Sequence, residues 1–393
     1  MNPKEFNTTR AGEIFEHQDQ GETIVTFLPS PLPPEIRYEE EMVRLVEEAA
    51  SNLNDLKGTG RNLSNPNIFI QPYILKEAVI SSQIEGTRTS FEEAVIQADE
   101  EVKDTRETRD LQEVRNYAEA LEYGMDRLEK EPLTVDLIKR IHEKLMSGVR
   151  GEQRSPGEFR EKQVHIGEIG VSREDADFVP MPPEKIEEAM EELIKFIQED
   201  HSMPYLVKSA LIHYQFETIH PFEDGNGRMG RLLIILDMLN KDKLTQPLLY
   251  LSEYFNNNKI RYYDKLQNVR EKGDYEEWIK FYLRAVKNQS RKSTETAVKI
   301  LEKKEDYRNK LRERGVPENC MNLMEEMFDL RSRTISDISE ELDVSYHTAR
   351  SYIRELKEEG IAEQLEREGR EQHYILGEIL DMMDEQSPEI IQN

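Results

Sequence analysis

Apolar residues recur at intervals of three and four along most of this 393-residue chain, which is the spacing of an amphipathic helix. One short stretch at residues 23–27 alternates instead and predicts a strand. Between residues 150 and 183 the helical spacing disappears and prolines accumulate. The fold class expected is therefore mainly α. The predicted helices cover residues 38–56, 71–86, 107–130, 134–146, 183–200, 204–219, 232–239 and 288–314.

The same pattern divides the chain into four parts. They are an N-terminal helical region (1–105), a helical bundle (106–290), a strongly charged helical linker (291–316) and a small C-terminal domain (317–393). In the last part, two short helical stretches flank a turn at Asp343–Ser345, and residues 361–376 alternate around a glycine. This order predicts a winged-helix domain, with a helix-turn-helix followed by a β-wing.

Charge and composition narrow the possible partners. The formal net charge is −27, from 53 basic and 80 acidic residues, which argues against a general binder of nucleic acid or anionic membranes. Cys320 is the only cysteine, so neither a disulfide framework nor a cysteine metal cluster is possible. The first residues have no apolar signal core, and no apolar run approaches about eighteen residues. We therefore expect a cytoplasmic protein without a membrane anchor.

The most informative stretch is His220-Pro-Phe-Glu-Asp-Gly-Asn-Gly-Arg-Met-Gly-Arg231, between two apolar helical runs. Gly225 and Gly227 give the backbone freedom that a tight turn needs. A glycine-rich loop that opens a helix presents free N–H groups and the positive end of the helix dipole, which suits an anion. Arg228 and Arg231 are three residues apart and would share one helix face above this anion site.

Two further side chains add chemistry to this loop. Asp224 is a hard oxygen ligand at the place where a phosphate-bound Mg²⁺ needs a carboxylate. His220 has an ordinary pKa suited to accepting a proton near neutrality. The alternatives are a packed histidine beside an ordinary turn, or a calcium loop, whose carboxylate spacing and closing glutamate are missing. Together the residue types indicate phosphoryl or nucleotidyl transfer.

At every defining position this stretch matches H-x-F-x-[D/E]-G-N-G-R-x-x-R, and the chain therefore resembles the Fic family. The resemblance implies transfer of AMP from ATP to a Ser, Thr or Tyr hydroxyl of a target protein, with release of pyrophosphate. Glycine at position 227 favours this reaction, since members that act as kinases carry lysine there. The implied roles are a base for His220, Mg²⁺ binding for Asp224, a loop anchor for Phe222, a phosphate cradle for Gly225, Asn226 and Gly227, and phosphate binding for Arg228 and Arg231.

A second stretch, Ser81-Ser-Gln-Ile-Glu-Gly86, ends a predicted helix. On its own, Glu85 would be a solvated carboxylate at an unfavourable helix end, and Gly86 an ordinary C-cap. However, the hexapeptide also resembles the inhibitory motif [S/T]-x-x-x-E-[G/N] of self-restrained Fic proteins. This resemblance implies that Glu85 pairs with Arg231 and occupies the place of the γ-phosphate, so that the resting protein is autoinhibited. A carboxylate and a phosphate would compete for the same guanidinium.

Two further sites follow from the resemblance. A flap hairpin that docks the target segment would include Val164, His165, Ile166 and Gly167, although a surface hairpin without function is the alternative. Asn258 and Tyr262 would contact adenosine, although paired tyrosines on a helix are usually part of a core.

Two whole-protein alternatives stay open. The same residues could remove AMP from a modified protein, with Glu85 positioning a water molecule. The chain could instead be a transcriptional regulator with a nucleotide-sensing domain, its DNA contacts supplied by Tyr346, His347, Arg350 and Arg354, with Arg367 or Arg370 on the wing. Residues 317–376 hold fifteen acidic and seven basic residues, a balance of −8, which disfavours DNA. A homodimer is expected from the family resemblance.

Overall fold

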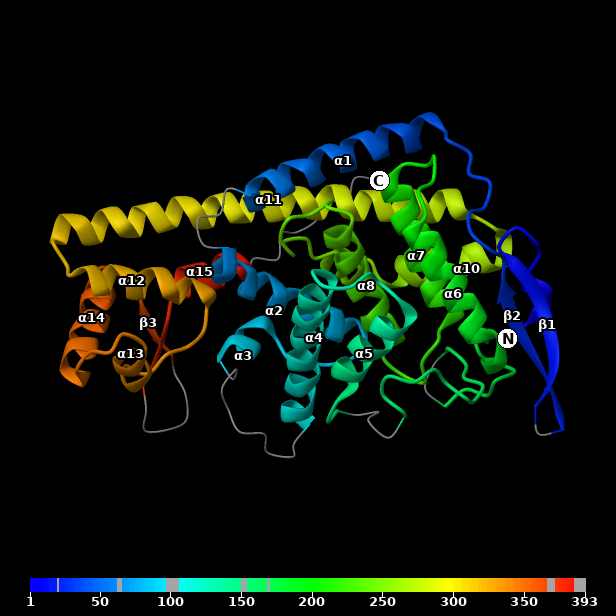
Figure 1. Ribbon diagram of the computed structural model, residues 1–393, viewed down its shortest axis with the longest axis horizontal. Coiled ribbons are helices and arrows are strands. Elements are labelled where there is room, and N and C mark those ends of the chain that lie inside the picture. The colour runs from blue at the N-terminus through cyan, green and yellow to red at the C-terminus, as the bar shows by residue number, and fades with distance from the viewer. Residues whose placement is uncertain are drawn as a thin grey trace.

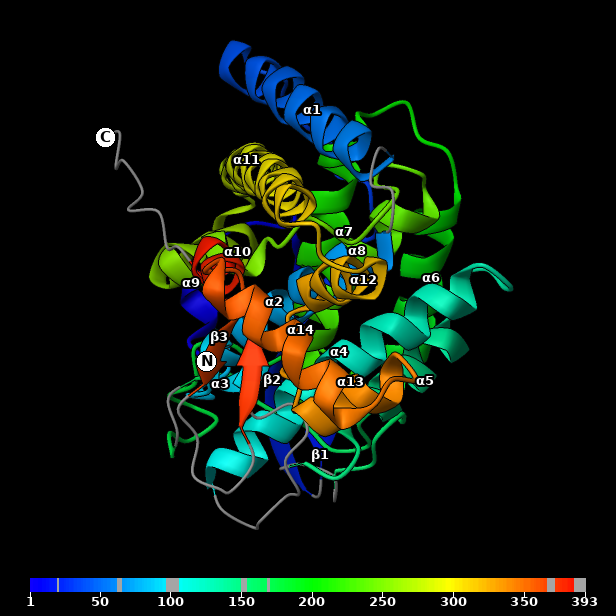
Figure 2. The same ribbon diagram turned by 90° about the vertical axis from the view of Figure 1, so that its left-hand side faces the viewer.

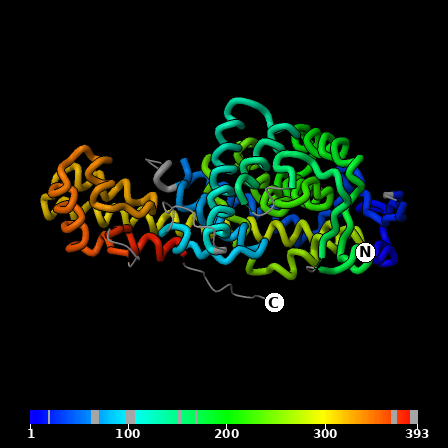
Figure 3. The backbone as a smooth tube through the Cα atoms, turned by 90° about the horizontal axis from the view of Figure 1, so that it is seen from below, coloured from blue at the N-terminus to red at the C-terminus, as the bar shows by residue number. Residues whose placement is uncertain are grey.

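We analysed a computed structural model, which describes residues 1–19, 21–61, 66–96, 106–149, 154–167, 170–365 and 372–384. The molecule is elongated, with a large helical body at one end and a small C-terminal unit at the other (Figures 1 and 3). One helix, α11 (Tyr275–Arg314), runs along most of its length and packs against α1 (Glu40–Arg61). The mainly α fold class is confirmed.

The N-terminal residues form a short 3₁₀ helix, η1 (Pro3–Glu5), which is followed along the chain by a β-hairpin. Strand β1 (Gly12–Asp19) pairs antiparallel with β2 (Glu22–Pro29), in the register Gly12 opposite Pro29. The predicted strand at residues 23–27 lies inside β2, whereas β1 was not predicted. A backbone hydrogen bond of 2.9 Å from Phe27 N to Val179 O fixes this hairpin to the body.

The helices predicted for the body before α11 are present, but some ends differ: one helix begins at Pro66 instead of residue 71, and another begins at Asn226 instead of residue 232. Two helices at its centre, α7 (Tyr205–Ile219) and α8 (Asn226–Asn240), are buried on nearly every side, as expected for helices that are apolar all round. The helices before α11 are α2 (Pro66–Ile84), α3 (Phe91–Ile96), α4 (Arg106–Leu128), α5 (Val135–Met146), η2 (Pro183–Lys185), α6 (Ile186–Gln198), α7 (Tyr205–Ile219), α8 (Asn226–Asn240), α9 (Ser252–Asn257) and α10 (Lys259–Lys272).

Local sequence signals account for several helix ends. Ser90 and Glu93 form a reciprocal pair at the start of α3, each side chain accepting a hydrogen bond from the other residue's N–H. Thr134 caps α5 by accepting a 3.1 Å hydrogen bond from Leu137 N. These caps end the connecting loops at defined residues and so fix where each helix meets the body.

The predicted boundary between the bundle and the linker, at residue 290, is not a break in the structure, because α11 crosses it as one continuous helix. The C-terminal unit begins after the end of α11. The unit contains one two-stranded antiparallel sheet, formed by β3 and β4. Its elements are α12 (Glu318–Glu326), η3 (Met327–Asp329), α13 (Ile335–Glu341), α14 (Tyr346–Glu358), β3 (Glu363–Leu365), β4 (His373–Ile375) and α15 (Gly377–Asp384). Figure 2 shows α13 and α14 facing the viewer, in front of the body. The winged-helix assignment stays a prediction, and Arg367 and Arg370 lie outside the described residues.

The expected flap has less sheet than the sequence suggested. Within the described residues, the segment around Ile166 forms a single β-bridge with Phe178, with backbone hydrogen bonds of 2.8 and 3.1 Å. No described helix is both long enough and apolar enough to span a bilayer.

Candidate active site

The loop between α7 and α8 is held in its conformation by hydrogen bonds between a side chain and the backbone of the loop itself. His220 ends α7 in a left-handed conformation with φ of 52°, and Gly225 is also left-handed with φ of 76°. The Asn226 amide donates to Phe222 O and accepts from Phe222 N, both at 2.9 Å. The loop from His220 to Asn226 is therefore a tight turn that uses the backbone freedom of Gly225, as predicted, whereas Gly227 lies in the first turn of α8 and does not belong to the loop. The Asn226 side chain anchors this loop. Its contribution to the predicted phosphate cradle is therefore limited to its backbone N–H at the start of α8.

A buried histidine of α5 packs against this loop and helps to hold it in place. The His142 ring stacks on Phe222 with centroids 3.6 Å apart and planes 4° apart. His142 Nδ1 accepts from Gly157 N at 3.0 Å, so Nε2 carries the proton and donates to Asp224 O at 2.9 Å. Burial lowers the pKa of His142 to about 4, which keeps the ring neutral. Phe222 is fully buried, which agrees with the predicted loop anchor.

Arg160 joins the flap segment to the same loop. Its N–H donates to Pro221 O at 2.9 Å, its Nε donates to His220 O at 2.9 Å, and its Nη2 donates to Met181 O at 2.6 Å. The side chain is only 3% exposed, and burial lowers its pKa to about 10. Arg160 therefore fixes the distance between the flap and the histidine.

His220 itself is half-buried, and its Nδ1 has no hydrogen-bond partner among the described residues. Burial, followed by the cationic side chains of Arg160 and Arg270, lowers the pKa of His220 to about 3. The imidazole is therefore neutral at physiological pH and can accept a proton. A bound polyanion would raise this pKa by offsetting the two arginines.

Asp224 lies at the rim with its side chain one-third exposed. Its Oδ1 accepts from Gly225 N at 2.8 Å, and its Oδ2 pairs with the exposed Arg154 at 3.1 Å. Exposed pairs of this kind contribute little energy and are easily replaced. The carboxylate therefore fits a Mg²⁺ ion, which proteins commonly hold through one or two carboxylates together with substrate phosphates.

The two motif arginines are both buried and both bonded to carboxylates. Arg228 Nη1 donates to Glu113 of α4 at 2.9 Å, and the two side chains are 3% and 2% exposed. Arg231 Nη2 donates to Glu85 Oε1 at 2.7 Å, while its Nε donates to Ser81 Oγ at 2.9 Å. The two arginines therefore have separate partners in this conformation.

The predicted Glu85–Arg231 pair is asymmetric in exposure. The Arg231 side chain is 2% exposed, whereas the Glu85 side chain is 33% exposed. Burial raises the pKa of Glu85, but the charge and hydrogen bond of Arg231 outweigh this effect and leave the pKa below its ordinary value. The arginine is thus fixed, and the ionised carboxylate faces the open side of the site. Gly86 follows with φ of 103° and ends the helix.

Gly227 lies directly beside this pair. A Cβ atom at position 227 would overlap Glu85 Oε1 and lie 3.0 Å from Arg231 Nη1. Position 227 opens α8, where the first N–H groups have no partner within the helix. The same residue therefore lies where the predicted phosphate cradle needs a free N–H group, and its lack of a side chain leaves room for Glu85.

The predicted adenosine contacts differ in their surroundings. Asn258 is half-buried between α9 and α10, and its amide donates to Tyr254 O at 3.1 Å. Tyr262 is 1% exposed, bonds to His213 through its hydroxyl at 2.8 Å and stacks on Phe255. Tyr262 is thus part of the aromatic core, and the exposed ring of this segment belongs to the adjacent Tyr263, which sequence reasoning did not select.

The predicted flap residues lie along one strip. Val164 and Ile166 are half-buried, while His165 and Gly167 are exposed. His165 Nε2 lies 3.2 Å from Val171 O. Ile166 uses its backbone in the bridge to Phe178, and Arg160 joins this segment to the loop of His220.

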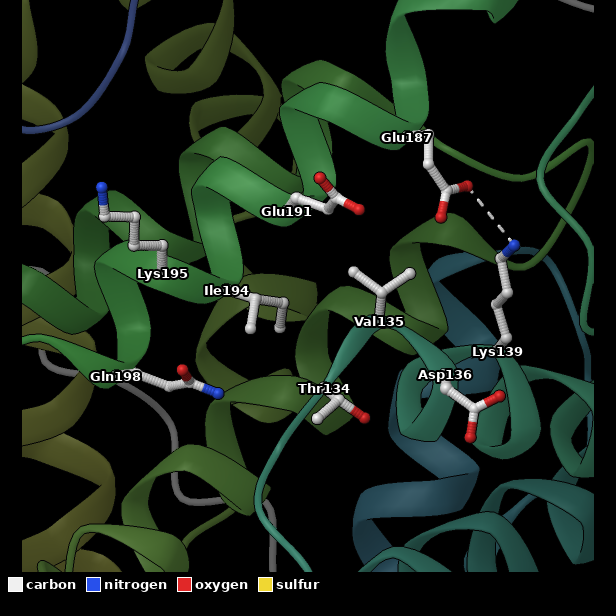
Figure 4. Close-up of a pocket in the computed structure, with 9 residues that line it drawn as sticks. All are labelled: Thr134, Val135, Asp136, Lys139, Glu187, Glu191, Ile194, Lys195 and Gln198. Carbon is white, nitrogen blue, oxygen red and sulfur yellow. Dashed lines mark hydrogen bonds and ion pairs between the residues drawn. The ribbon is translucent and has the colours of Figure 1, made fainter.

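A separate groove of about 480 Å³ lies between α5 and α6 (Figure 4). Its lining mixes both charges, and a Lys139–Glu187 ion pair of 3.5 Å lies at one end. None of the predicted site residues lines it.

The comparisons with known proteins agree with this fold and site. Residues 43–126 match the Fic/DOC family N-terminal region, and residues 132–236 match the Fic/DOC family. Residues 132–236 therefore form a Fic/DOC-family domain, and the proteins to which the chain is similar include protein adenylyltransferases.

The chain is 32% identical over 168 residues to a probable protein adenylyltransferase of Aquifex aeolicus, a match covering 41% of this chain and 47% of that protein. It is 27% identical over 113 residues to a protein adenylyltransferase of Caenorhabditis briggsae, covering 28% of this chain and 20% of that protein. The chain thus spans less than half of the length of these relatives.

Two solved structures show the same fold. A Fic family protein from Desulfovibrio desulfuricans G20 has a TM-score of 0.57 and 23% identity, and the match covers 88% of this chain and 98% of that structure. Fic-1 from C. elegans has a TM-score of 0.52 and 19% identity, covering 66% of this chain and 74% of that structure. At these identities the likeness concerns the fold alone.

Proposed function

We propose that this protein transfers AMP from ATP to a Ser, Thr or Tyr hydroxyl of a target protein, and that Glu85 restrains the transfer. The observation that carries this proposal is the ion pair that Glu85 makes with Arg231, the last residue of a complete His220–Arg231 motif. A buried arginine is held ready for an anion, and a partly exposed carboxylate of the same chain occupies it.

In the proposed reaction, His220 accepts the proton of the target hydroxyl. The hydroxyl oxygen then forms a bond to the α-phosphorus of ATP, the bond from that phosphorus to the bridging oxygen breaks, and pyrophosphate leaves. The N–H groups that open α8 and the Arg231 guanidinium would bind the phosphates. Mg²⁺ held by Asp224 would neutralise part of the phosphate charge. The flap strip at residues 164–167 would align the target backbone beside His220.

The experiment compares the wild type with Glu85→Gly and with Glu85→Gly/His220→Ala, each incubated with α-labelled ATP and Mg²⁺. We expect label on protein in Glu85→Gly, little in the wild type and none in the double variant. Glu85→Gln serves as the matched control, because it removes the charge but keeps the size of the side chain. Absence of label from Glu85→Gly in the presence of cell extract would overturn the proposal.

Removal of AMP is a second candidate function, favoured by the ionised and partly exposed Glu85 carboxylate, which could orient a water molecule. This reaction would need Glu85, whereas AMP transfer would be restrained by it. AMP-modified protein should then lose its label with the wild type but keep it with Glu85→Gly. Binding of DNA by the exposed residues of α14 and formation of a homodimer are not needed by either reaction, and both stay predictions.

A further inference from the structure

Helix α2 carries Ser81 near its C-terminal end and leads into Glu85. It packs against α4 and α9 of the body and also against η3 of the C-terminal unit. In Figure 1, α15 lies beside α2, on the side of the C-terminal unit that faces the body. Although the C-terminal unit is more than 230 residues away in sequence from Glu85, it therefore touches the helix that positions this carboxylate.

Lys76 is the polar link between α2 and the last described helix. Its side chain is 3% exposed, and its Nζ donates a hydrogen bond to the Met383 carbonyl at the end of α15. The same Nζ lies 3.8 Å from Glu253 Oε1 of α9. A buried ammonium group requires such partners, because an unpaired buried charge is costly. Lys76 therefore fixes the end of α15 to α2, nine residues before Glu85.

The segment after Glu85 is held by the same helix. Helix α3, which begins five residues after Gly86, packs against α15. Helix α15 is in turn fixed to α11 through Glu378, which accepts from Tyr307 Oη at 2.9 Å and pairs with Lys303. Residues on both sides of Glu85 thus contact the C-terminal unit, and any displacement of α15 removes a support from each.

The contact of the C-terminal unit with α2 and α3 includes polar groups that water can solvate, so the two parts can separate. A cavity of about 120 Å³ lies between α2, α3, α9 and Asp384, and its lining includes Lys76, Gln83, Ser90 and Glu253. Glu253 Oε2 is buried and has no hydrogen-bond partner among the described residues. Polar cavities of this size admit water, and contacts between domains of one chain generally resemble transient interfaces.

We propose that the face formed by Met327–Asp329 and Gly377–Asp384 is a docking surface for α2 and α3 of the same chain, and that this docking holds Glu85 on Arg231. Movement of the C-terminal unit away from α2 would loosen both ends of the Glu85 segment and raise AMP transfer. The docking surface thereby gives the C-terminal unit control over the site. The activity readout of this inference rests on the proposed function, whereas its structural readout does not.

The test uses the full chain with Lys76→Met, which keeps the length and the apolar stem but removes the hydrogen bond to Met383. Hydrogen exchange of the amides in residues 77–96 should accelerate about fivefold or more, the low end of an ordinary coupling between sites. AMP transfer should rise in Lys76→Met, but it should not rise further when Lys76→Met is added to Glu85→Gly. Failure of both exchange and transfer to respond would overturn the docking surface.

Lys292→Met is the matched control, because Lys292 pairs with the same Glu253 carboxylate at 2.8 Å but makes no hydrogen bond or ion pair with the described residues of α15. If it accelerates exchange as much as Lys76→Met does, the effect belongs to Glu253 and the inference is wrong. Should Lys76→Met fail to fold, Glu378→Gln loosens α15 from the outside, since the Glu378 side chain is 44% exposed. If no variant, including Glu85→Gly, transfers AMP, the proposed function fails, while the exchange result still decides the docking surface.

Discussion

Gly227 and Glu85 share one space, because a Cβ atom at position 227 would overlap Glu85 Oε1. We therefore expect Gly227→Ala to displace the carboxylate from Arg231. Alanine favours a helix over glycine by about 1 kcal/mol, so the change should be neutral or stabilising once Glu85 is absent. In the wild type it should be less favourable by about 1 kcal/mol, the coupling expected between residues in contact. Urea unfolding of both single variants and the double variant with Glu85→Gly measures this difference. Equal effects in the two backgrounds would mean that the two residues do not compete for space.

The buried Arg228–Glu113 pair should matter far more for stability than the exposed Arg154–Asp224 pair. Glu113→Ala leaves an unpaired buried guanidinium, which should lower the free energy of unfolding by about 3–5 kcal/mol. Arg154→Ala should lower it by about 1 kcal/mol or less. The exposed Glu119 lies on the same helix as Glu113, so Glu119→Ala is the control for changes in α4 and should alter stability little. Equal losses in Glu113→Ala and Arg154→Ala would show that burial does not set the energy of these pairs.

The helix–loop–helix around His220 could be predicted because its signals are local. Two glycines, an asparagine and two apolar runs lie within one continuous stretch, and Phe222 could be assigned to the core from the resemblance alone. The pairing of Glu85 with Arg231 was also predicted, although the two residues are 146 positions apart. That prediction depended on a second motif, since no periodicity connects them.

The supports of the site could not be predicted in this way. Glu113, His142 and Arg160 act through partners far away in the sequence, and each lies in a segment that was assigned to the helical core or the flap. For Glu113 and His142 the only local signal was a charged or imidazole group on an otherwise apolar helix face, which has many ordinary explanations, and Arg160 lies in a segment without regular secondary structure. Tyr262 shows the converse case: its place in the family pattern suggested a ligand contact, but its ring packs into an aromatic cluster.

His142→Ala should loosen the motif loop, because it removes the stack on Phe222 and the hydrogen bonds to Gly157 and Asp224. The free energy of unfolding at pH 7.5 should fall by about 3 kcal/mol, from a lost buried ring and two hydrogen bonds. His201→Ala, which alters a partly exposed ring, is the control and should cost about 1 kcal/mol or less. A loss no larger than that of the control would exclude a supporting role for His142.

The same variant should also change the response to acid. The pKa of His142 is lowered to about 4 in the folded protein, below its value of about 6.5 in an unfolded chain. As the pH falls below about 6.5, the unfolded chain takes up a proton that the folded protein refuses, so the contribution of this histidine to stability is lost. The difference in stability between the wild type and His142→Ala should therefore shrink between pH 7 and pH 5 in urea titrations. A constant difference would mean that the ring takes up its proton at the same pH in the folded and the unfolded protein.

Glu77 should produce the opposite dependence on pH. Burial raises the pKa of Glu77 to about 7, although hydrogen bonds from Ser252 and the charge of Arg231 oppose this shift. A raised carboxyl pKa stabilises the folded state fully below the unfolded value of about 4.5, and this contribution is lost as the pH rises through about 7. Glu77→Gln keeps the size of the side chain and cannot ionise, so its stability relative to the wild type should improve from pH 5 to pH 8, by about 3 kcal/mol at most. If urea midpoints of the two proteins run parallel over this range, Glu77 is ionised in the folded protein, and Arg231 then has a second anionic neighbour beside Glu85.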